Sequence, residues 1–457
     1  MPSRRLDITL DFGITLDGRP VPPRPLGALL ENGARLHFAY DATFIALPLP
    51  VSPHVLPVRA GVHAHHERAF DYVPGLIADS LPDGWGKTVQ DRSFSGLGVP
   101  RERINAVDRL AAIGAAGMGA LTFTPAAPLD PDDGSTVWPL DLDALAAQAG
   151  RVLSGSAEEL LPALRAAGGS PGGARPKVLA GLRESGCGAI DLIAGVTPAT
   201  VTGRAPALPS EYVPYLVKFG TQDDVRLYGR DAGAVEEAYA RMARAAGLEV
   251  PETRLLHAGD GERHFAIRRF DRHGAGGVGR LHMHTLAGLL HASHQEPSLD
   301  YEAFVQATKW LTRDHVATVE AFRRAVFNVL AHNRDDHTKN FAYLMDSAGR
   351  WRLAPAYDLT FSTGPNGHHT TSVAGESLAP TETHLASVAE AGGVHPREGR
   401  EVLEQVGDAV GRWPEFAGEV NVASTVSQRF TETFNRVRRD VLPTSTARRA
   451  RARHRRS

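Results

Sequence analysis

The most constraining feature of the chain is a polar stretch that follows a predicted helix and precedes two predicted strands. It runs from His332 to Asn340 and reads HNRDDHTKN. Before it, apolar residues recur at positions 316, 319, 322, 326 and 330, which predicts an amphipathic helix. After it, FAYLM and WRLAP flank a DSAG turn and predict two short strands, which would return Asp358 to the polar loop.

The spacing within this stretch fits the chemistry of phosphoryl transfer. Asp335 and Asn340 have the D-x-x-x-x-N spacing of kinase catalytic loops, where the aspartate accepts the proton of the attacking hydroxyl and the asparagine holds Mg²⁺. Asp358 is the candidate for a second metal ligand, since Mg²⁺ prefers hard oxygen donors. Taken alone, Asp335, Asp336 and Asn340 also fit an ordinary polar turn after a helix.

Several further motifs give the chain a resemblance to a known family. DDHTKNF and LAPAYDLTF, with DSLPDGWGK, GGSPGGARPK, YLVKF and RRFDR upstream, resemble the HipA family of bacterial serine/threonine kinases, the toxins of toxin–antitoxin pairs. The motifs are spread over residues 70–362 in the order of the family. The resemblance implies an α+β, protein-kinase-like bilobal fold with an additional β-rich N-terminal subdomain and a mostly helical C-lobe.

The N-terminal region, residues 1–125, alternates short apolar runs with Gly/Pro turns and is expected to be the β-rich subdomain. Within it, DSLPDGWGK predicts a helix that opens after Asp83, with Trp85 as a core residue. A Pro/Asp-rich segment at 125–139 marks the end of this subdomain.

Three further regions are expected after that boundary. Residues 140–270 would be a region like a kinase N-lobe that carries the Gly-rich loop, and residues 271–445 the helical C-lobe that carries the catalytic loop. Residues 446–457 form an Arg-rich tail, which fits a solvated terminus as well as a contact with nucleic-acid phosphates.

The Gly-rich segment at 168–177 is a candidate for the ATP loop. Its residues Ser170, Gly172, Gly173 and Lys177 would let the backbone approach phosphates closely, although a flexible connector fits the same composition. The resemblance places this loop near ATP and aligns Ser170 with a serine whose autophosphorylation switches the kinase off.

Further nucleotide contacts follow the Gly-rich segment. Lys218 ends the predicted strand PYLVKFG and would grip phosphates, as the strand lysine of kinases does. By family position, Glu237 in the next predicted helix is its partner, although a carboxylate there also favours the helix dipole. The resemblance places backbone groups near Arg269 and Phe270, after an edge strand, against adenine.

Two residues of the central loop receive lesser roles. Lys339 would neutralise the transferring phosphate or contact solvent. His337 would order the loop by hydrogen bonds rather than exchange protons.

Two groups of histidines have metal-like spacing without a complete ligand set. The first group lacks a fourth ligand nearby, so we interpret it as part of an exposed polar strand: His63, His65 and His66. The second group lacks an acidic or Cys partner, so we interpret it as residues on the faces of helices: His282, His284, His291 and His294.

Composition constrains the environment of the protein. The chain has 457 residues, of which 42% are hydrophobic and 22% charged, values that are ordinary for a soluble globular protein. A net charge of −2 implies no general attraction to nucleic acid or membrane. The single cysteine, Cys187, excludes an internal disulfide and suits a reducing compartment. With no apolar run of a signal peptide or membrane span, we expect a cytoplasmic protein.

These observations predict an ATP- and Mg²⁺-dependent serine/threonine protein kinase. Asp335 would be the catalytic residue, with Asn340 and Asp358 holding the metal. The resemblance implies a protein substrate in translation, such as an aminoacyl-tRNA synthetase, and growth arrest as the result. It also implies a HipB-like helix-turn-helix antitoxin that carries most DNA contacts.

Two alternatives stay open. One is a small-molecule phosphotransferase, since such kinases use the same Asp, Asn and Asp. The other is a non-catalytic regulator on a kinase scaffold. The intact Asp335, Asn340, Asp358 and Lys218 argue against this second alternative, because a decayed site loses such residues.

Ser170→Ala is expected to keep phosphoryl transfer to the substrate and to abolish self-inactivation, because the resemblance makes this hydroxyl the acceptor of autophosphorylation. Incubation with labelled ATP, followed by phosphopeptide mapping, checks this. A variant that is still labelled within its own Gly-rich loop would contradict the assignment.

Overall fold

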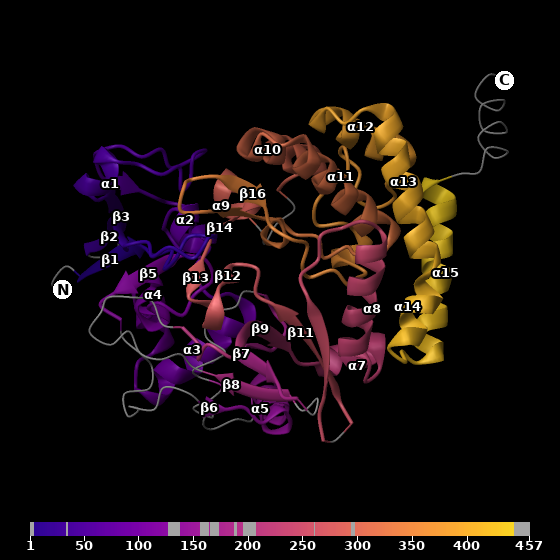
Figure 1. The fold of residues 1–457 in the computed structure, drawn as a ribbon, viewed down its shortest axis with the longest axis horizontal. Helices are drawn as coiled ribbons and strands as arrows, with labels where there is room; N and C mark the ends of the chain where they lie inside the picture. Colours follow the sequence, from indigo (N-terminus) through magenta and orange to yellow (C-terminus); the bar gives the residue numbers. More distant parts are fainter. Residues whose placement is uncertain are drawn as a thin grey trace. The chain divides into compact units, whose positions relative to one another are not determined.

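A computed structural model gives the fold, shown in Figure 1. It describes residues 4–32, 35–126, 138–155, 164, 173–186, 190–194, 207–259, 261–293 and 298–442, without the side chains of residues 138, 222, 223 and 225. The chain divides into two compact units. Unit 1 consists of Met1–Val225, Glu252–His291 and Ala342–Trp351, and unit 2 of Arg226–Pro251, Ala292–Phe341 and Arg352–Ser457.

Unit 1 begins with a five-stranded antiparallel sheet of order β4-β3-β2-β1-β5. Residues alternate along β1, where Leu6, Ile8 and Leu10 are fully buried, because one face of the sheet is covered. The strands are β1 (Arg4–Leu10), β2 (Arg24–Asn32), β3 (Arg35–Tyr40), β4 (His63–Ala64) and β5 (Leu121–Thr124).

Short helices between these strands complete the core of this part of unit 1. The helices are α1 (Ala42–Ala46), η1 (Arg68–Phe70), α2 (Gly75–Ala78), α3 (Gly84–Gly96), η2 (Arg101–Arg103) and α4 (Ala106–Ile113). As predicted, α3 opens after Asp83, and Trp85 is a core residue with 1% exposure.

A second sheet of unit 1 has the order β10-β11-β9-β7-β8-β6. Its strands are β6 (Trp138–Pro139), β7 (Lys177–Glu184), β8 (Ile190–Ala194), β9 (Val213–Lys218), β10 (Thr253–His257) and β11 (Arg263–Arg268). Helix α5 (Leu142–Ser154) contributes Leu145, Ala149 and Val152 to the same core. The predicted strands are confirmed, with one correction. The strand that precedes Arg269 is not an edge strand, because β11 lies between β10 and β9.

A buried ion cluster fixes the chain after β11. Asp271 is fully buried and accepts hydrogen bonds from Arg269 Nη2 and the Gly119 N–H, each at 2.8 Å. Arg272 pairs with the same carboxylate and donates to the Gly117 carbonyl at 2.7 Å. Burial alone would raise the pKa of Asp271, but the two guanidinium groups hold it below its usual range. The segment that contains Gly117 and Gly119 is therefore held against this ion cluster.

The remaining strands of unit 1 correct the interpretation of two histidines. Residues from 281 onward do not turn helical at once, because His282 and His284 lie in a strand that pairs with β15. The elements are β12 (Arg272–His273), η3 (Ala275–Gly277), β13 (Gly279–Arg280), β14 (His282–Thr285), α9 (Leu286–Leu290) and β15 (Ala342–Met345). The chain then enters unit 2 within β16 (Trp351–Leu353), in a sheet of order β14-β15-β16.

Unit 2 is mostly helical, and α11 packs against α10, α12, α13 and α15. The helices are α8 (Ala232–Ala245), α10 (Tyr301–Thr312), α11 (His315–Leu330), η4 (Thr338–Asn340), η5 (Pro365–Gly367), α12 (Glu382–Gly392), α13 (Pro396–Gly411), α14 (Trp413–Glu419) and α15 (Ser424–Val441). Helix α7 (Gln222–Tyr228) contains the boundary between the units.

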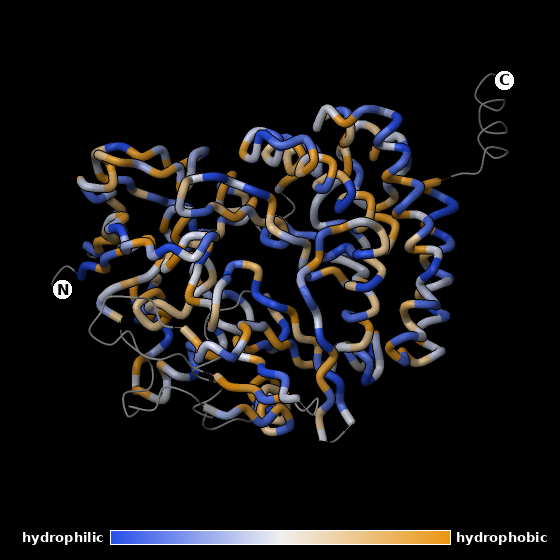
Figure 2. Tube along the Cα trace, viewed as in Figure 1, coloured by the Kyte–Doolittle hydropathy of each residue, from blue (hydrophilic) through white to orange (hydrophobic). Residues whose placement is uncertain are grey.

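The apolar stripe predicted for α11 is buried with one exception. Phe322, Val326 and Leu330 are fully buried, but Val316 is 75% exposed because it lies in the first turn, beside the N-cap Asp314. Figure 2 shows hydrophilic and hydrophobic residues alternating along α13 and α15, as expected for surface helices. Within the described ranges, no helix has both the length and the apolar character needed to cross a bilayer.

We expect acid to destabilise unit 1 through His282. Its ring is fully buried, with Nε2 2.9 Å from the Val51 carbonyl, and burial followed by the nearby His284 lowers its pKa from 6.5 to about 4. Between about pH 6.5 and pH 4, His282 therefore binds a proton in the unfolded chain but not in the folded chain, so the folded state loses stability as the pH falls.

This histidine should remove stability at up to about 1.4 kcal/mol per pH unit across that window, and its contribution is fully present above pH 6.5. Urea unfolding of the wild type and of His282→Gln at several pH values from 7 to 4 measures it. The variant should show the shallower loss. Parallel curves would reject the assignment.

Candidate active site

The central loop begins where α11 ends. Ala331 caps the helix, and His332 adopts a φ of 52°, a left-handed conformation that turns the chain away from the helix axis. The Asn333 N–H still donates to the Asn328 carbonyl at 2.9 Å, which holds the start of the loop against the helix. The predicted order of helix, polar loop and strand is thus confirmed.

One hydrogen bond connects the two candidate residues of this loop, Asp335 and Asn340. The side-chain amide of Asn340 donates from Nδ2 to the backbone carbonyl of Asp335 at 2.8 Å. This bond closes the loop. Because the amide nitrogen of Asn340 points to the Asp335 carbonyl, the amide oxygen points away from that carbonyl. The Asp335 side chain is exposed, while the side chain of the next residue, Asp336, is fully buried.

Asn340 and Asp358 line one small pocket of unit 2. Asp358 has a φ of 56°, a conformation that residues other than glycine adopt rarely and that often marks functional positions. Arg324, Asn328 and Asn333 also line this cavity. An amide oxygen and a carboxylate are suitable ligands for Mg²⁺.

Asn333 strengthens the fit of the cavity to a cation. Its Oδ1 is buried and has no hydrogen-bond partner among the described residues. Buried acceptors are rarely left in this state, so a cation or an ordered water would satisfy it. Asn333, Asn340 and Asp358 therefore offer side-chain oxygens that suit a metal ion.

A chain of hydrogen bonds connects the two segments that meet here. Tyr301 donates its hydroxyl to Asp336 at 2.7 Å and accepts from Asn328 Nδ2 at 2.8 Å. Asn333 Nδ2 donates to Asn328 Oδ1 at 3.0 Å and lies 3.5 Å from the carbonyl of Asp358. The positions of the central loop and of the Asp358 backbone are therefore coupled.

Asp336 is an anchor rather than a second catalytic carboxylate. Besides Tyr301, it accepts from His369 Nδ1 and from the Thr370 N–H, each at 2.8 Å, and from the Thr371 N–H at 3.3 Å. It thus binds residues 369–371, part of the Gly/Ser/Thr-rich segment after Asp358. The polar-turn interpretation of the loop fits Asp336.

Aromatic stacking holds the other end of the loop. His332 stacks on Phe361 with ring centroids 4.9 Å apart, and Phe361 stacks on Phe430 of α15 at 4.2 Å. Burial, followed by the charge of Arg334, lowers the pKa of His332 to about 4. The ring is therefore neutral near pH 7, with Nδ1 3.1 Å from the Ser362 carbonyl.

Three other predicted residues lie in unit 2. Glu237 is buried in α8, where one oxygen pairs with Arg241 Nε at 2.9 Å and Oε2 has no hydrogen-bond partner among the described residues. The His337 carbonyl accepts from the Asn340 N–H at 2.8 Å, so His337 helps to shape the loop through its backbone. The half-buried Lys339 accepts at its carbonyl from the Tyr357 hydroxyl.

Two predicted lysines occupy opposing positions in unit 1. Lys218, the last residue of β9, pairs in register with Lys177, the first residue of β7, and both are buried. Lys218 Nζ lies 5.7 Å from the ring centroid of Phe265 on the next strand. Two ammonium groups on paired strands concentrate positive charge, and this arrangement suits a polyphosphate.

The described end of the Gly-rich segment is fixed by DSLPDGWGK, a motif for which the sequence analysis predicted only a helix start and a core residue. Ser170 and Gly172 lie outside the described residues. The Gly173 N–H donates to the Asp83 carboxylate, and its carbonyl accepts from the Trp85 N–H at 2.9 Å. A Cβ at Gly84 would lie 2.5 Å from the Gly173 oxygen. This motif thus holds Gly173 in place, a relation that no local pattern reveals.

The two residues predicted near adenine have defined surroundings. Arg269 directs its guanidinium to Asp271, and its backbone N–H donates to the Pro214 carbonyl at 2.9 Å. Because the N–H of Arg269 is already used, its carbonyl is the backbone group that would bind a ligand. Phe270, the next residue, is half-buried.

Sequence reasoning missed a Ser–His–Asp relay in unit 1. His284 lies with Nε2 3.0 Å from Ser52 Oγ and Nδ1 2.6 Å from Asp79 Oδ2. This order of groups resembles a hydrolase triad, but Ser52 is only 1% exposed, and Asp79 also accepts from the Thr285 N–H at 2.7 Å. The relay therefore acts as a buried structural network, and it gives His284 the acidic partner that we expected it to lack.

Comparison with known proteins identifies two family domains in the chain. The HipA N-terminal domain matches residues 21–124, and the HipA-like C-terminal domain matches residues 169–413. A Haemophilus influenzae protein named "Putative kinase" is 29% identical over 138 residues, which are 27% of this chain and 39% of that protein. The chain thus matches well under half the length of this relative.

A solved structure resembles nearly the whole chain. It is HipA of Shewanella oneidensis MR-1, in complex with HipB and operator DNA. The match has a TM-score of 0.66 and 17% identity, and it covers 96% of this chain and 97% of that chain. The expected α+β, kinase-like fold is confirmed.

We expect Asp336→Ala to destabilise unit 2 by about 3 kcal/mol or more, because the change leaves Tyr301, His369 and two backbone N–H groups without their buried acceptor. Urea unfolding checks this. The adjacent Asp335→Ala is a matched control and should stay within about 0.5 kcal/mol of the wild type, since its side chain is exposed. Equal losses in the two variants would contradict the anchor role.

Proposed function

We propose that this chain, which belongs to the HipA family, is an ATP- and Mg²⁺-dependent serine/threonine protein kinase of the toxin type. The observation that supports this most is the shared cavity of Asn340 and Asp358, beside a loop that the Asn340–Asp335 hydrogen bond closes. Phosphoryl transfer requires oxygen ligands for the metal ion, here Asn340 and Asp358, and a carboxylate that the substrate hydroxyl can reach, here the exposed Asp335.

Each residue of this loop has a role that follows from its surroundings. Asp335, which is exposed, would orient the substrate hydroxyl and accept its proton. Asn340 and Asp358 would hold Mg²⁺, which neutralises phosphate charge when bound. The hydrogen-bond chain through Asn333 would keep Asp358 in register with the loop.

The nucleotide contacts of the proposal come from further residues. Lys218 and Lys177 would bind phosphate oxygens, with the Gly-rich loop at Ser170, Gly172 and Gly173 covering them. Glu237 would orient Lys218, and its unpartnered buried Oε2 favours a cationic neighbour.

The remaining contacts rest on the family resemblance. Lys339 would neutralise the transferring phosphate, and backbone groups near Arg269 and Phe270 would meet adenine. His337 would support the loop through the bond from its carbonyl to Asn340.

The proposed binding partners of this chain are taken from its resemblance to the HipA family. The HipA structure that it resembles contains HipB and operator DNA. We therefore propose a HipB-like helix-turn-helix antitoxin through which DNA is contacted, and a cytoplasmic protein substrate in translation, such as an aminoacyl-tRNA synthetase. Co-purification with the product of a short neighbouring helix-turn-helix reading frame tests the first part.

Asp335→Asn should lower phosphoryl transfer by at least ~10²-fold, since it removes the group that accepts the proton. The purified protein, given labelled ATP and Mg²⁺, is assayed for label on itself and on added proteins. The control Asp408→Asn changes an exposed carboxylate of α13 and should keep full activity.

Further outcomes decide between the functions. Asp358→Asn and Asn340→Ala should raise the Mg²⁺ concentration needed for half-maximal activity. Full activity of Asp335→Asn would reject the site. Label found only on small molecules would instead establish a small-molecule phosphotransferase.

A further inference from the structure

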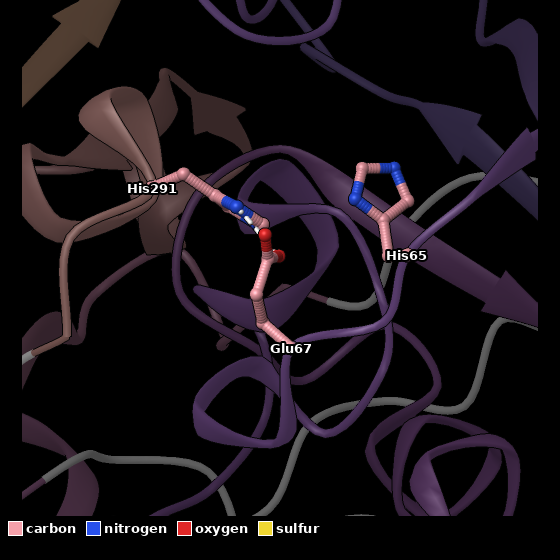
Figure 3. A group of neighbouring side chains, drawn as sticks. All are labelled: His65, Glu67 and His291. Atoms are coloured by element: carbon pink, nitrogen blue, oxygen red, sulfur yellow. Dashed lines mark ion pairs between the residues drawn. The ribbon is translucent and has the colours of Figure 1, made fainter.

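Three side chains of unit 1 that the sequence analysis did not group together lie close to one another. His65 follows β4, Glu67 caps η1, and His291 caps α9. One ligand atom from each lies within 4.8 Å of the other two. Figure 3 shows His65 and Glu67, from one stretch of chain, beside His291 from another.

The protonatable atoms of this cluster are incompletely satisfied. His291 Nδ1 pairs with Glu67 Oε2 at 2.8 Å. His65 Nε2 and His291 Nε2 are buried and have no hydrogen-bond partner among the described residues. Two buried imidazole nitrogens without a hydrogen bond are costly for a purely structural contact, but they are ordinary for metal ligands before binding.

The rings are held in place before any ligand arrives. His291 has a left-handed φ of 54° at the C-cap of α9, and its ring stacks on Phe70 with centroids 4.1 Å apart. The His65 ring meets the His291 ring edge-on at 5.5 Å. The Glu67 side chain is 57% exposed, so it can rotate, and it leaves the cluster open to solvent.

We propose that His65, Glu67 and His291 form a binding site for a divalent transition-metal cation of the Zn²⁺ class. Four-coordinate zinc, with bonds of about 2.0–2.2 Å, places its ligand atoms about 3.4 Å apart, so modest side-chain rotation completes the site. Two imidazoles and one carboxylate favour Zn²⁺, Co²⁺ or Ni²⁺ over Mg²⁺ and Ca²⁺, which prefer all-oxygen sites.

This site corrects the interpretation of both histidine groups. His65 belongs to no exposed polar strand, and His291 has an acidic neighbour, because Glu67 and His291 meet only in the folded chain. His294 lies outside the described residues. A bound cation would tie the segment after β4 to the end of α9, both within unit 1.

Equilibrium dialysis of the full chain against Zn²⁺ in a large excess of Mg²⁺ tests the proposal. The wild type should bind one equivalent, and Co²⁺ should give the visible absorption of a four- or five-coordinate site. His65→Ala and His291→Ala should each weaken binding by about 100-fold or more. Glu67→Gln keeps the size of an exposed side chain, so the fold is retained while a ligand charge is lost.

The chain offers a matched control for its many histidines. His315 Nε2 pairs with Glu398 at 3.0 Å on the surface of unit 2. Among the described residues, no third possible metal ligand joins this pair. His315→Ala should therefore bind like the wild type. Zn²⁺ should also raise the melting temperature of the wild type and of His315→Ala but not of Glu67→Gln. Wild-type binding equal to that of Glu67→Gln, or no binding in the wild type, would overturn the proposal.

Discussion

The arrangement of the central loop, residues 332–340, depends on one buried carboxylate. Asp336 has no exposed surface, and a charge in that position persists only when donors surround it. Tyr301, His369 and the backbone of Thr370 supply them, from α10 and from the segment after Asp358. The loop therefore cannot move without breaking contacts with two other parts of unit 2. This rigidity is what a site that aligns reacting groups requires.

Burial, more than residue type, separates the roles of neighbouring residues. Asp335 and Asp336 are chemically the same, but one is exposed and the other is enclosed by donors. Similarly, His284 lies in a fully paired relay with Ser52 and Asp79, while His65 retains a buried nitrogen without a hydrogen-bond partner. The first histidine is structural, and the second is suited to coordinate an ion.

Several motifs that resemble family signatures have structural explanations in this chain. RRFDR supplies Asp271 and its two arginines, which hold the loop at Gly117 and Gly119. DSLPDGWGK supplies Asp79 to the β14–α9 junction and Asp83 to the end of the Gly-rich loop. Each of these motifs supplies charged or polar groups that hold a segment distant in the sequence.

The sequence by itself determined what depends on residues a few positions apart. It predicted α11, the strands around Lys218, and the polar loop that holds Asp335 and Asn340, because helix periodicity, strand alternation and motif spacing are local. Only the tertiary structure decided that Asp336 is an anchor, that β11 is an inner strand, and that Glu67 meets His291. Those facts depend on which distant segments the core brings together, and no short pattern in a single sequence records that proximity.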